Sequence, residues 1–190
     1  MRVLVVGAGG VGSSMASIAE TRGFFTSFVL ADTDLERAQR AVSVLDDPQR
    51  FHATRVDASD TTDVERCIAE TEATVVVNAC DPRFNQSIFE ACYRTGVTYL
   101  DMASTLSVPH TLHPYSEIGS LLGAHEYEAN EKWEKRGILA LIGIGVEPGL
   151  SDLFARYAAD HLFDTIDEIG VRDGSNLSID GYDFAPTFSI

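Results

Sequence analysis

The chain opens with MRVLVVGAGGVG (residues 1–12), an apolar run followed directly by glycines in the spacing GxGxxG. Each of the three glycines has its own expected task. Gly7 turns the chain sharply, and Gly9 lets the backbone approach a pyrophosphate that a Cβ would hold away. Gly12 lets the next helix lie close to the first strand. We therefore expect a strand, a tight turn and a helix whose N-terminus faces phosphate groups.

A lone acid closes the second apolar run. Residues 24–31 are predicted as a strand, and Asp32 follows it, about 20 residues after Gly12. A carboxylate at this place accepts hydrogen bonds from the ribose 2′-OH of NAD and repels the 2′-phosphate of NADP. We expect NAD, with NADP less favoured, and Arg37 is the residue that would reverse this preference. The alternative interpretation is a structural glycine turn with an acid nearby by chance.

Strand and helix signals alternate from Arg2 to about Gly145, which indicates a parallel sheet covered on both faces. The predicted fold class is α/β, a Rossmann-type doubly wound parallel sheet. Capping boxes at 33–36 and 62–65 predict two of the helix starts, each with a threonine as the cap. The expected strands lie at residues 2–7, 26–31, 52–56, 73–78, 98–101 and 138–144.

Ligands of doubly wound sheets lie beyond the carboxyl ends of the strands. We expect residues 56–58 to face the adenine and residues 78–80 to face the nicotinamide ribose. Asp57 is a candidate acceptor for the adenine amino group, with an acid in a turn or at a helix N-terminus as the alternative. The predicted cofactor-binding residues are Gly7, Gly9, Gly10, Val11, Gly12, Asp32, Thr33, Asp57, Ala58, Asn78, Ala79 and Cys80.

Composition narrows the class of partner. The 190 residues include 14 Lys and Arg against 29 Asp and Glu, and the net charge of −15 disfavours nucleic acid and anionic membranes. No apolar run approaches the roughly 20 residues of a membrane span, and no signal peptide is recognised at the start. Cys67, Cys80 and Cys92 lack CxxC spacing, so we expect reduced thiols in a cytoplasmic protein and no metal site.

Two segments in the second half of the chain depart from the alternating pattern. Residues 104–123 lack periodicity, which suggests a lid, a substrate loop or an oligomer contact, or else a plain surface insertion. Residues 126–136 are strongly charged, with Tyr127 and Trp133 as apolar anchors. We expect them to form one largely solvated helix.

A later motif carries a family resemblance. Residues 143–155 read GIGVEPGLSDLFA. Together with GAGGVG, the Val-Asp-Ala corner at 56–58 and GVTYLD at 96–101, this motif resembles the saccharopine dehydrogenase family, including its lysine 6-dehydrogenase and carboxynorspermidine synthase-like branches. The family usually has Gly-x-Asp-Pro-Gly here, and Glu147 departs from it by one methylene while keeping the carboxylate.

The resemblance implies an NAD(P)-dependent oxidoreductase that acts on a C–N bond of an amino acid or polyamine. A hydride would pass between the nicotinamide and the carbon of an imine. Such chemistry needs a group that exchanges a proton near the reacting nitrogen, and the candidate catalytic residues are Asp101 and Glu147. The alternative for Glu147 is an acid stabilised by the dipole of the following helix.

The resemblance also divides the chain. Residues 1–148 correspond to an NAD(P)-binding domain, and residues 149–190 to a crossover helix and the incomplete start of an α+β substrate or dimerisation domain. We expect a well-packed helix at 148–162, a strand at 165–171 and turns at 173–182, with the strand edge favouring a homodimer. Two other functions remain open: a nucleotide-sensing regulatory module without catalysis, and a dehydrogenase that acts on a carbon skeleton.

Overall fold

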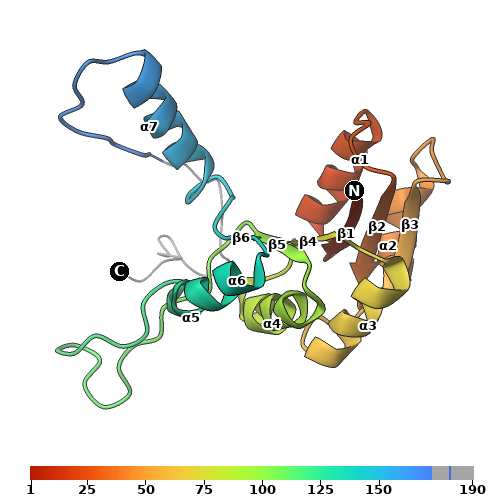
Figure 1. The fold of residues 1–190 in the computed structure, drawn as a ribbon, viewed down its shortest axis with the longest axis horizontal. Helices are drawn as coiled ribbons and strands as arrows, with labels where there is room; N and C mark the ends of the chain where they lie inside the picture. The colour runs from red at the N-terminus through yellow and green to blue at the C-terminus, as the bar shows by residue number, and fades with distance from the viewer. Residues whose placement is uncertain (173–179, 181–190) are drawn as a thin grey trace. The chain divides into compact units, whose positions relative to one another are not determined.

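A six-stranded parallel sheet forms the centre of the computed structural model, which describes residues 1–172 and residue 180. The strand order is β3-β2-β1-β4-β5-β6 (Figure 1), so the chain changes direction across the sheet between β1 and β4. In doubly wound sheets such a point opens a crevice for ligands. The strands are β1 (Arg2–Val6), β2 (Ser27–Asp32), β3 (Phe51–Arg55), β4 (Val75–Asn78), β5 (Thr98–Asp101) and β6 (Ala140–Leu141).

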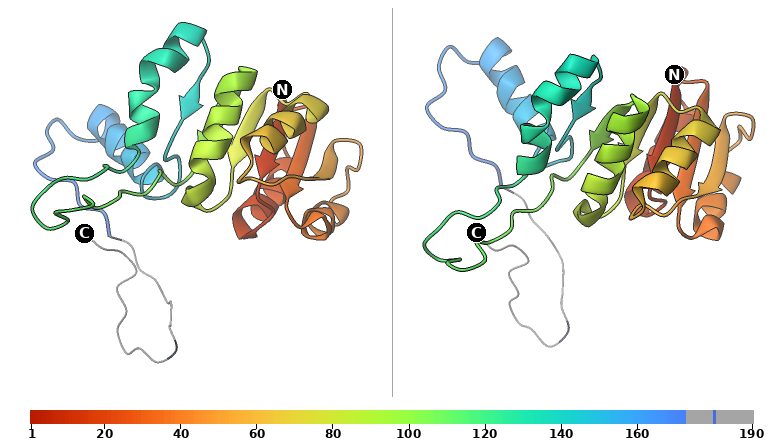
Figure 2. Two further views of the ribbon diagram at one scale, coloured as in Figure 1. Left: turned by 90° about the horizontal axis from the view of Figure 1, so that it is seen from below. Right: turned by 60° about the horizontal axis from the view of Figure 1, so that its bottom comes forward.

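Helices cover both faces of the sheet, and the predicted fold class is confirmed (Figures 1 and 2). Helices α1 and α2 lie on one face, and α3, α4 and α6 lie on the other. Within the described residues no helix is long and apolar enough to cross a membrane. The helical segments are α1 (Gly10–Glu20), α2 (Leu35–Ser43), α3 (Thr61–Thr71), the 3-10 turn η1 (Pro82–Phe84), α4 (Asn85–Thr95), α5 (Ala124–Glu128), α6 (Asn130–Arg136) and α7 (Leu150–His161).

The core lies on both sides of the sheet because successive side chains of a strand point to opposite faces. Leu4 and Val76 pack toward α3 and α4, whereas Val3, Val5 and Phe28 pack toward α1 and α2. All five side chains are buried. Burial on both faces explains why residues 3–6 of β1 are an unbroken apolar run rather than an alternating one.

Two predicted helix starts are wrong in detail. The carboxylate of Asp34, and not the hydroxyl of Thr33, caps α2 by accepting from the backbone N–H of Arg37. Asp60 caps α3 in the same way, through the N–H of Thr62. Aspartate is as good an N-cap as threonine, and its charge adds a favourable interaction with the helix dipole.

The charged segment expected as one helix is divided in two. Helix α5 ends before Ala129, and α6 follows it. Trp133 is buried as expected, but Tyr127 is exposed and Glu126 is buried in its place.

Strand β6 is also shorter than predicted. Residues 104–123 form loops and turns joined by an isolated bridge between Val108 and Ser120.

The chain divides into two compact units, Met1–Asp152 and Leu153–Ile190, which we describe separately. Helix α7 begins at Leu150, two residues later than predicted, and buries none of its residues, so the expected firm packing is not observed. Residues 165–171 do not form the predicted strand. A strand needs a neighbour for its backbone hydrogen bonds, and the described part of this unit has none. Of the turns predicted at 173–182, only residue 180 lies within the described residues.

Candidate functional site

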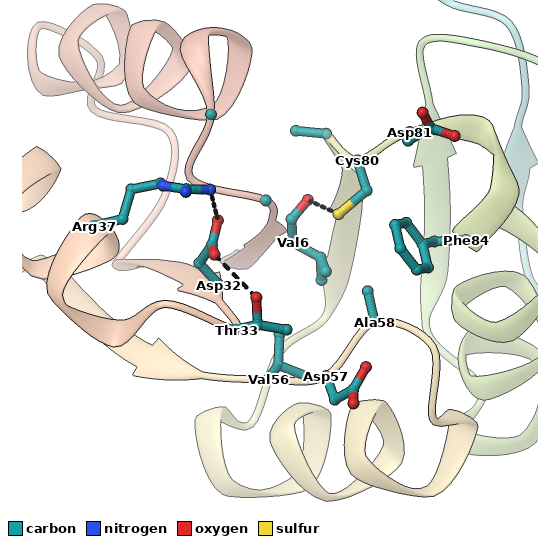
Figure 3. Close-up of a pocket in the computed structure, with 13 residues that line it drawn as sticks. Val6, Asp32, Thr33, Arg37, Val56, Asp57, Ala58, Cys80, Asp81 and Phe84 are labelled. Atoms are coloured by element: carbon teal, nitrogen blue, oxygen red, sulfur yellow. Dashed lines mark hydrogen bonds and ion pairs between the residues drawn. The ribbon is translucent and has the colours of Figure 1, made fainter.

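A cleft of about 260 Å³ opens at the carboxyl ends of β1 to β4 (Figure 3). Eight of the twelve predicted cofactor residues line it. These are Gly7, Gly9, Asp32, Thr33, Asp57, Ala58, Ala79 and Cys80. The structure thus brings together residues from four separate segments of the sequence. Gly10, Val11, Gly12 and Asn78 are not among the residues that line the cleft.

The glycine turn has the geometry that its spacing predicts. Gly7 has a φ of +106°, and a Cβ there would lie 2.8 Å from the carbonyl oxygen of Ala79. A Cβ on Gly12 would lie 1.9 Å from the carbonyl oxygen of Gly7, so α1 packs directly against the turn. At Gly9 and Gly10 a Cβ would meet nothing within 4 Å. The free space therefore lies at these two glycines, where a phosphate would need to approach the backbone.

The N-terminus of α1 opens onto the same space. Gly9 is its N-cap and has no side chain with which to bind the first N–H groups, and the first turn carries no acidic residue. The first N–H groups of a helix lack intrahelical acceptors and carry the positive end of its dipole. Gly10 and Val11 lie in this first turn. The turn therefore fits a pyrophosphate held by backbone amides.

Asp32 fixes the position of the glycine turn relative to β2. Its Oδ2 accepts from the N–H of Ala8 at 2.8 Å, and its Oδ1 accepts from the N–H of Asp34 at 2.9 Å. The side chain is largely buried but still lines the cleft. Each carboxylate oxygen can accept more than one hydrogen bond, so Asp32 can also accept from a ribose hydroxyl.

Arg37 faces the same carboxylate from α2 (Figure 3). Its Nη1 lies 3.7 Å from Oδ2 of Asp32, and its Nε lies 3.9 Å from Oδ2 of Asp34. The arginine side chain is 54% exposed, which leaves it room to move. A guanidinium at this place can pair with the 2′-phosphate of NADP. The cleft thus contains both an acceptor suited to NAD and a donor suited to NADP.

Asp57 closes a turn at the end of β3. Its Oδ1 accepts from the N–H of Ser59 at 2.9 Å and from the hydroxyl of Ser59 at 2.6 Å. These hydrogen bonds hold the pKa of Asp57 below its usual value. The contacts match the turn role that the sequence left open beside adenine recognition.

Asn78 supports the cleft from beneath. Its Oδ1 accepts from the N–H of Cys80 at 2.9 Å, and its Nδ2 donates to Asn85 at 2.8 Å and to the hydroxyl of Tyr99 at 3.2 Å. The side chain is buried, so Asn78 shapes the chain after β4. Burial raises the pKa of the Cys80 thiol to about 11, and its Sγ donates to the carbonyl oxygen of Val6.

The two predicted catalytic acids do not line the cleft. Asp101 is 1% exposed, and its carboxylate accepts from the N–H of Gly143 at 2.6 Å and from the hydroxyl of Tyr99 at 2.9 Å. Burial raises the pKa of Asp101, while these two hydrogen bonds oppose the rise. Glu147 is exposed in the segment before α7. Asp101 therefore anchors the start of the segment that carries Glu147.

Sequence reasoning missed several residues of the cleft. Phe84 ends the η1 turn and lines the cleft across from Asp32 (Figure 3). Asp81 caps this turn through the N–H of Arg83. The dipeptide Asp81-Pro82, which begins three residues after the end of β4, is the signal that indicates such a turn. Val6, the last residue of β1, also lines the cleft. Val56 lines it too, within the corner at 56–58 that was expected to face the adenine.

A glycine turn that leads into an open helix N-terminus, with a carboxylate at the end of β2, defines a Rossmann-type nucleotide-binding domain. The family model described as the saccharopine dehydrogenase NADP binding domain matches residues 3–141. The chain belongs to the saccharopine dehydrogenase family, which confirms the resemblance seen in the sequence.

Relatives and solved structures agree with this assignment. Carboxynorspermidine synthase from Vibrio alginolyticus is 33% identical over 198 residues, which cover 99% of this chain and 46% of the relative. Carboxyaminopropylagmatine dehydrogenase from Synechocystis is 27% identical over 188 residues, which cover 99% of this chain and 45% of the relative. The chain thus spans about half the length of these relatives. Apo saccharopine dehydrogenase (L-Glu forming) from Saccharomyces cerevisiae shares the fold, with a TM-score of 0.63 and 19% identity over 85% of this chain and 31% of that one.

Proposed function

We propose that this chain is the cofactor-binding part of an NAD(P)-dependent oxidoreductase that acts on a C–N bond of an amino acid or polyamine. The observation that carries the proposal is the open glycine turn facing Asp32, in a chain whose relatives are named carboxynorspermidine synthase and carboxyaminopropylagmatine dehydrogenase. The substrate is an imine or the corresponding secondary amine.

Each part of the site then has a physical task. A bound nicotinamide dinucleotide supplies or accepts the hydride. The backbone amides after Gly9 hold the diphosphate, and Asp32 accepts from the ribose. Asp101 positions the segment after β6, and Glu147 offers an exposed carboxylate that can contact the amine or exchange a proton.

The cofactor preference depends on two side chains of opposite charge. We propose that NAD is preferred because Asp32 is held at the cleft by two backbone hydrogen bonds, whereas Arg37 is exposed and paired with aspartates. Calorimetry of NADH and NADPH binding tests this on the wild-type chain, Asp32→Ala and Arg37→Ala. We expect Asp32→Ala to weaken NADH binding by about tenfold or more, and Arg37→Ala to affect NADPH only. Tighter NADPH binding by the wild type would reverse the proposed preference.

The reaction itself is tested on a protein of the relatives' length that includes this chain. A primary amine and an aldehyde should condense to an imine with loss of water. Hydride from the reduced cofactor and one proton should then convert the imine to a secondary amine, leaving the oxidised cofactor. Glu147→Gln should lower kcat, because glutamine cannot exchange the proton. Cofactor oxidation without formation of a new C–N bond would exclude the proposed reaction. Light scattering of the same sample tests the homodimer that we also propose.

A further inference from the structure

A second cavity lies away from the dinucleotide cleft, between α4, α5, α6 and β6. Its volume is about 420 Å³, within the range of sites that hold small molecules. We propose that this cavity binds a small organic cation, a primary alkylammonium, through Glu126. The two cavities share no lining residue, so this inference does not depend on the proposed function.

The carboxylate of Glu126 carries the argument. Glu126 is 5% exposed, and the hydroxyl of Thr105 donates to its Oε1. Its Oε2 is buried and has no hydrogen-bond partner among the described residues. No lysine, arginine or histidine of the described part forms an ion pair with Glu126. A buried carboxylate oxygen without a donor is costly, and a bound ammonium would supply both the donor and the charge.

The charges around the cavity select a cation. Its lining includes the acids Glu126 and Glu134 and contains no basic side chain among the described residues. Asp101 lies close enough for the charge of Glu126 to help raise its pKa. A negative group would therefore be repelled, and a positive group would relieve the repulsion between the acids.

The walls indicate what kind of cation fits. Trp133, Phe89 and Tyr127 give aromatic surface, and Ile138 and Ile142 give aliphatic surface. Aromatic faces attract ammonium groups, and apolar walls favour an alkyl body over a bare ion. A divalent metal needs several oxygen ligands, and no group of three His, Cys, Asp or Glu side chains that could hold one is found in the described part of the chain. An alkylammonium needs only one carboxylate.

The chain contains a built-in probe of this cavity. Trp133 is its only tryptophan, and it lines the cavity. Titration of the full 190-residue chain with 1,4-diaminobutane, without dinucleotide, should change the tryptophan fluorescence and saturate at one site. Salt near 0.15 M screens weak attraction to the acidic surface, because the Debye length is then about 8 Å.

The decisive comparison uses two variants of α5. Glu126→Gln keeps the shape and removes the charge, and we expect it to weaken diaminobutane binding by about tenfold or more. Glu128→Gln makes the same charge change on an exposed residue of the same helix that does not line the cavity, and binding should not change. An equal loss in both variants would show general attraction to an acidic surface and would overturn the proposal, as would the absence of saturable binding.

The wild-type chain provides a test that does not depend on the folding of a variant. The neutral diol 1,4-butanediol has nearly the same shape as diaminobutane but no charge. We expect the diol to leave Trp133 fluorescence unchanged at concentrations at which the diamine saturates it. An equal response to both ligands would show that Glu126 plays no part, and the proposal would fail whether or not the chain binds NAD(P).

Discussion

Asp101 joins two segments that lie 42 residues apart, because its Oδ1 accepts from the N–H of Gly143. Asp101→Ala removes this acceptor and leaves the buried N–H of Gly143 unpaired. We expect the free energy of unfolding to fall by about 1–3 kcal/mol, measured by urea denaturation. Asp101→Asn keeps an acceptor oxygen and should lose clearly less. Equal stability of Asp101→Ala and the wild type would mean that the contact does not anchor this segment.

The rate at which the Cys80 thiol reacts depends on pH and reports on the cleft. Its pKa is raised from 9.0 to about 11 by burial, so the thiolate that reacts with disulfide reagents is scarce at neutral pH. We expect its reaction with such a reagent to accelerate as the pH rises from 9 toward 11, and bound dinucleotide to slow it. Cys80→Ser is the control, because the remaining Cys67 and Cys92 are buried. Rapid reaction at neutral pH would contradict the burial of this thiol.

The same raised pKa affects stability. The folded state keeps the proton of Cys80 at a pH where the unfolded state has lost it. The contribution of this thiol to the free energy of unfolding is therefore fully present below pH 9 and is lost as the pH rises toward 11.

The acids at the strand ends show what sequence can establish about single residues. Asp32 and Asp101 both end strands, and both were expected near the ligand. Only Asp32 lines the cleft, because Gly143 and Tyr99 bind the carboxylate of Asp101 in the interior. Strand ends follow from local pattern. Exposure depends on which distant segment folds over the residue, and a single sequence does not specify that.

At the scale of elements, the turn between β1 and α1 offers a matched pair of variants. Gly12→Ala would place a Cβ 1.9 Å from the carbonyl oxygen of Gly7, so we expect a loss of stability of about 1–3 kcal/mol or more. Gly9→Ala meets nothing within 4 Å and should fold normally. It should still weaken dinucleotide binding, because its Cβ would occupy the space that a pyrophosphate needs. Thermal unfolding and calorimetry of the two variants separate these effects.

Opposite results are equally informative. Normal NADH binding by a folded Gly9→Ala would show that the phosphates do not approach this glycine. An unchanged melting temperature of Gly12→Ala would show that α1 can move away from the turn at no cost.

Element identity was easier to predict than element boundaries. The strand, the turn and α1 follow from an apolar run and from glycines whose tasks are steric, so they were correctly predicted. The N-caps of α2 and α3 are Asp34 and Asp60 rather than the predicted threonines. Several neighbouring side chains can serve as caps, and the backbone conformation determines which of them does. The division between α5 and α6 at Ala129 had no sequence signal, since the charged pattern runs through it.

At the scale of the whole molecule, the sequence pattern predicts the structure of the first unit more fully than that of the second. In the first unit, each of the six strands forms its backbone hydrogen bonds with a neighbouring strand of the same sheet. The alternating strand and helix signals were therefore enough to predict this sheet. The apolar pattern at 165–171 predicted a strand, but strand formation requires a partner for the backbone hydrogen bonds. The relatives that match this chain are about twice its length. Pattern alone therefore predicts the first unit better than the second.

This division leads to a prediction about cofactor binding. The residues that line the dinucleotide cleft all lie between Val6 and Phe84, within the first unit. A chain that ends at Leu162 retains that unit together with α7 (Leu150–His161). We expect it to bind NADH with a Kd within about twofold of the 190-residue chain, a difference below roughly 0.5 kcal/mol.

Calorimetry on both chains measures the difference, and circular dichroism verifies that the shorter chain is folded. A Kd raised tenfold or more in a folded shorter chain would show that residues after 162 contribute to dinucleotide binding, because that change corresponds to about 1.4 kcal/mol of lost interaction. The cofactor would then be held by both units. Equal affinities would instead mean that the first unit alone supplies the binding energy for the dinucleotide. The second unit would then be available for substrate binding.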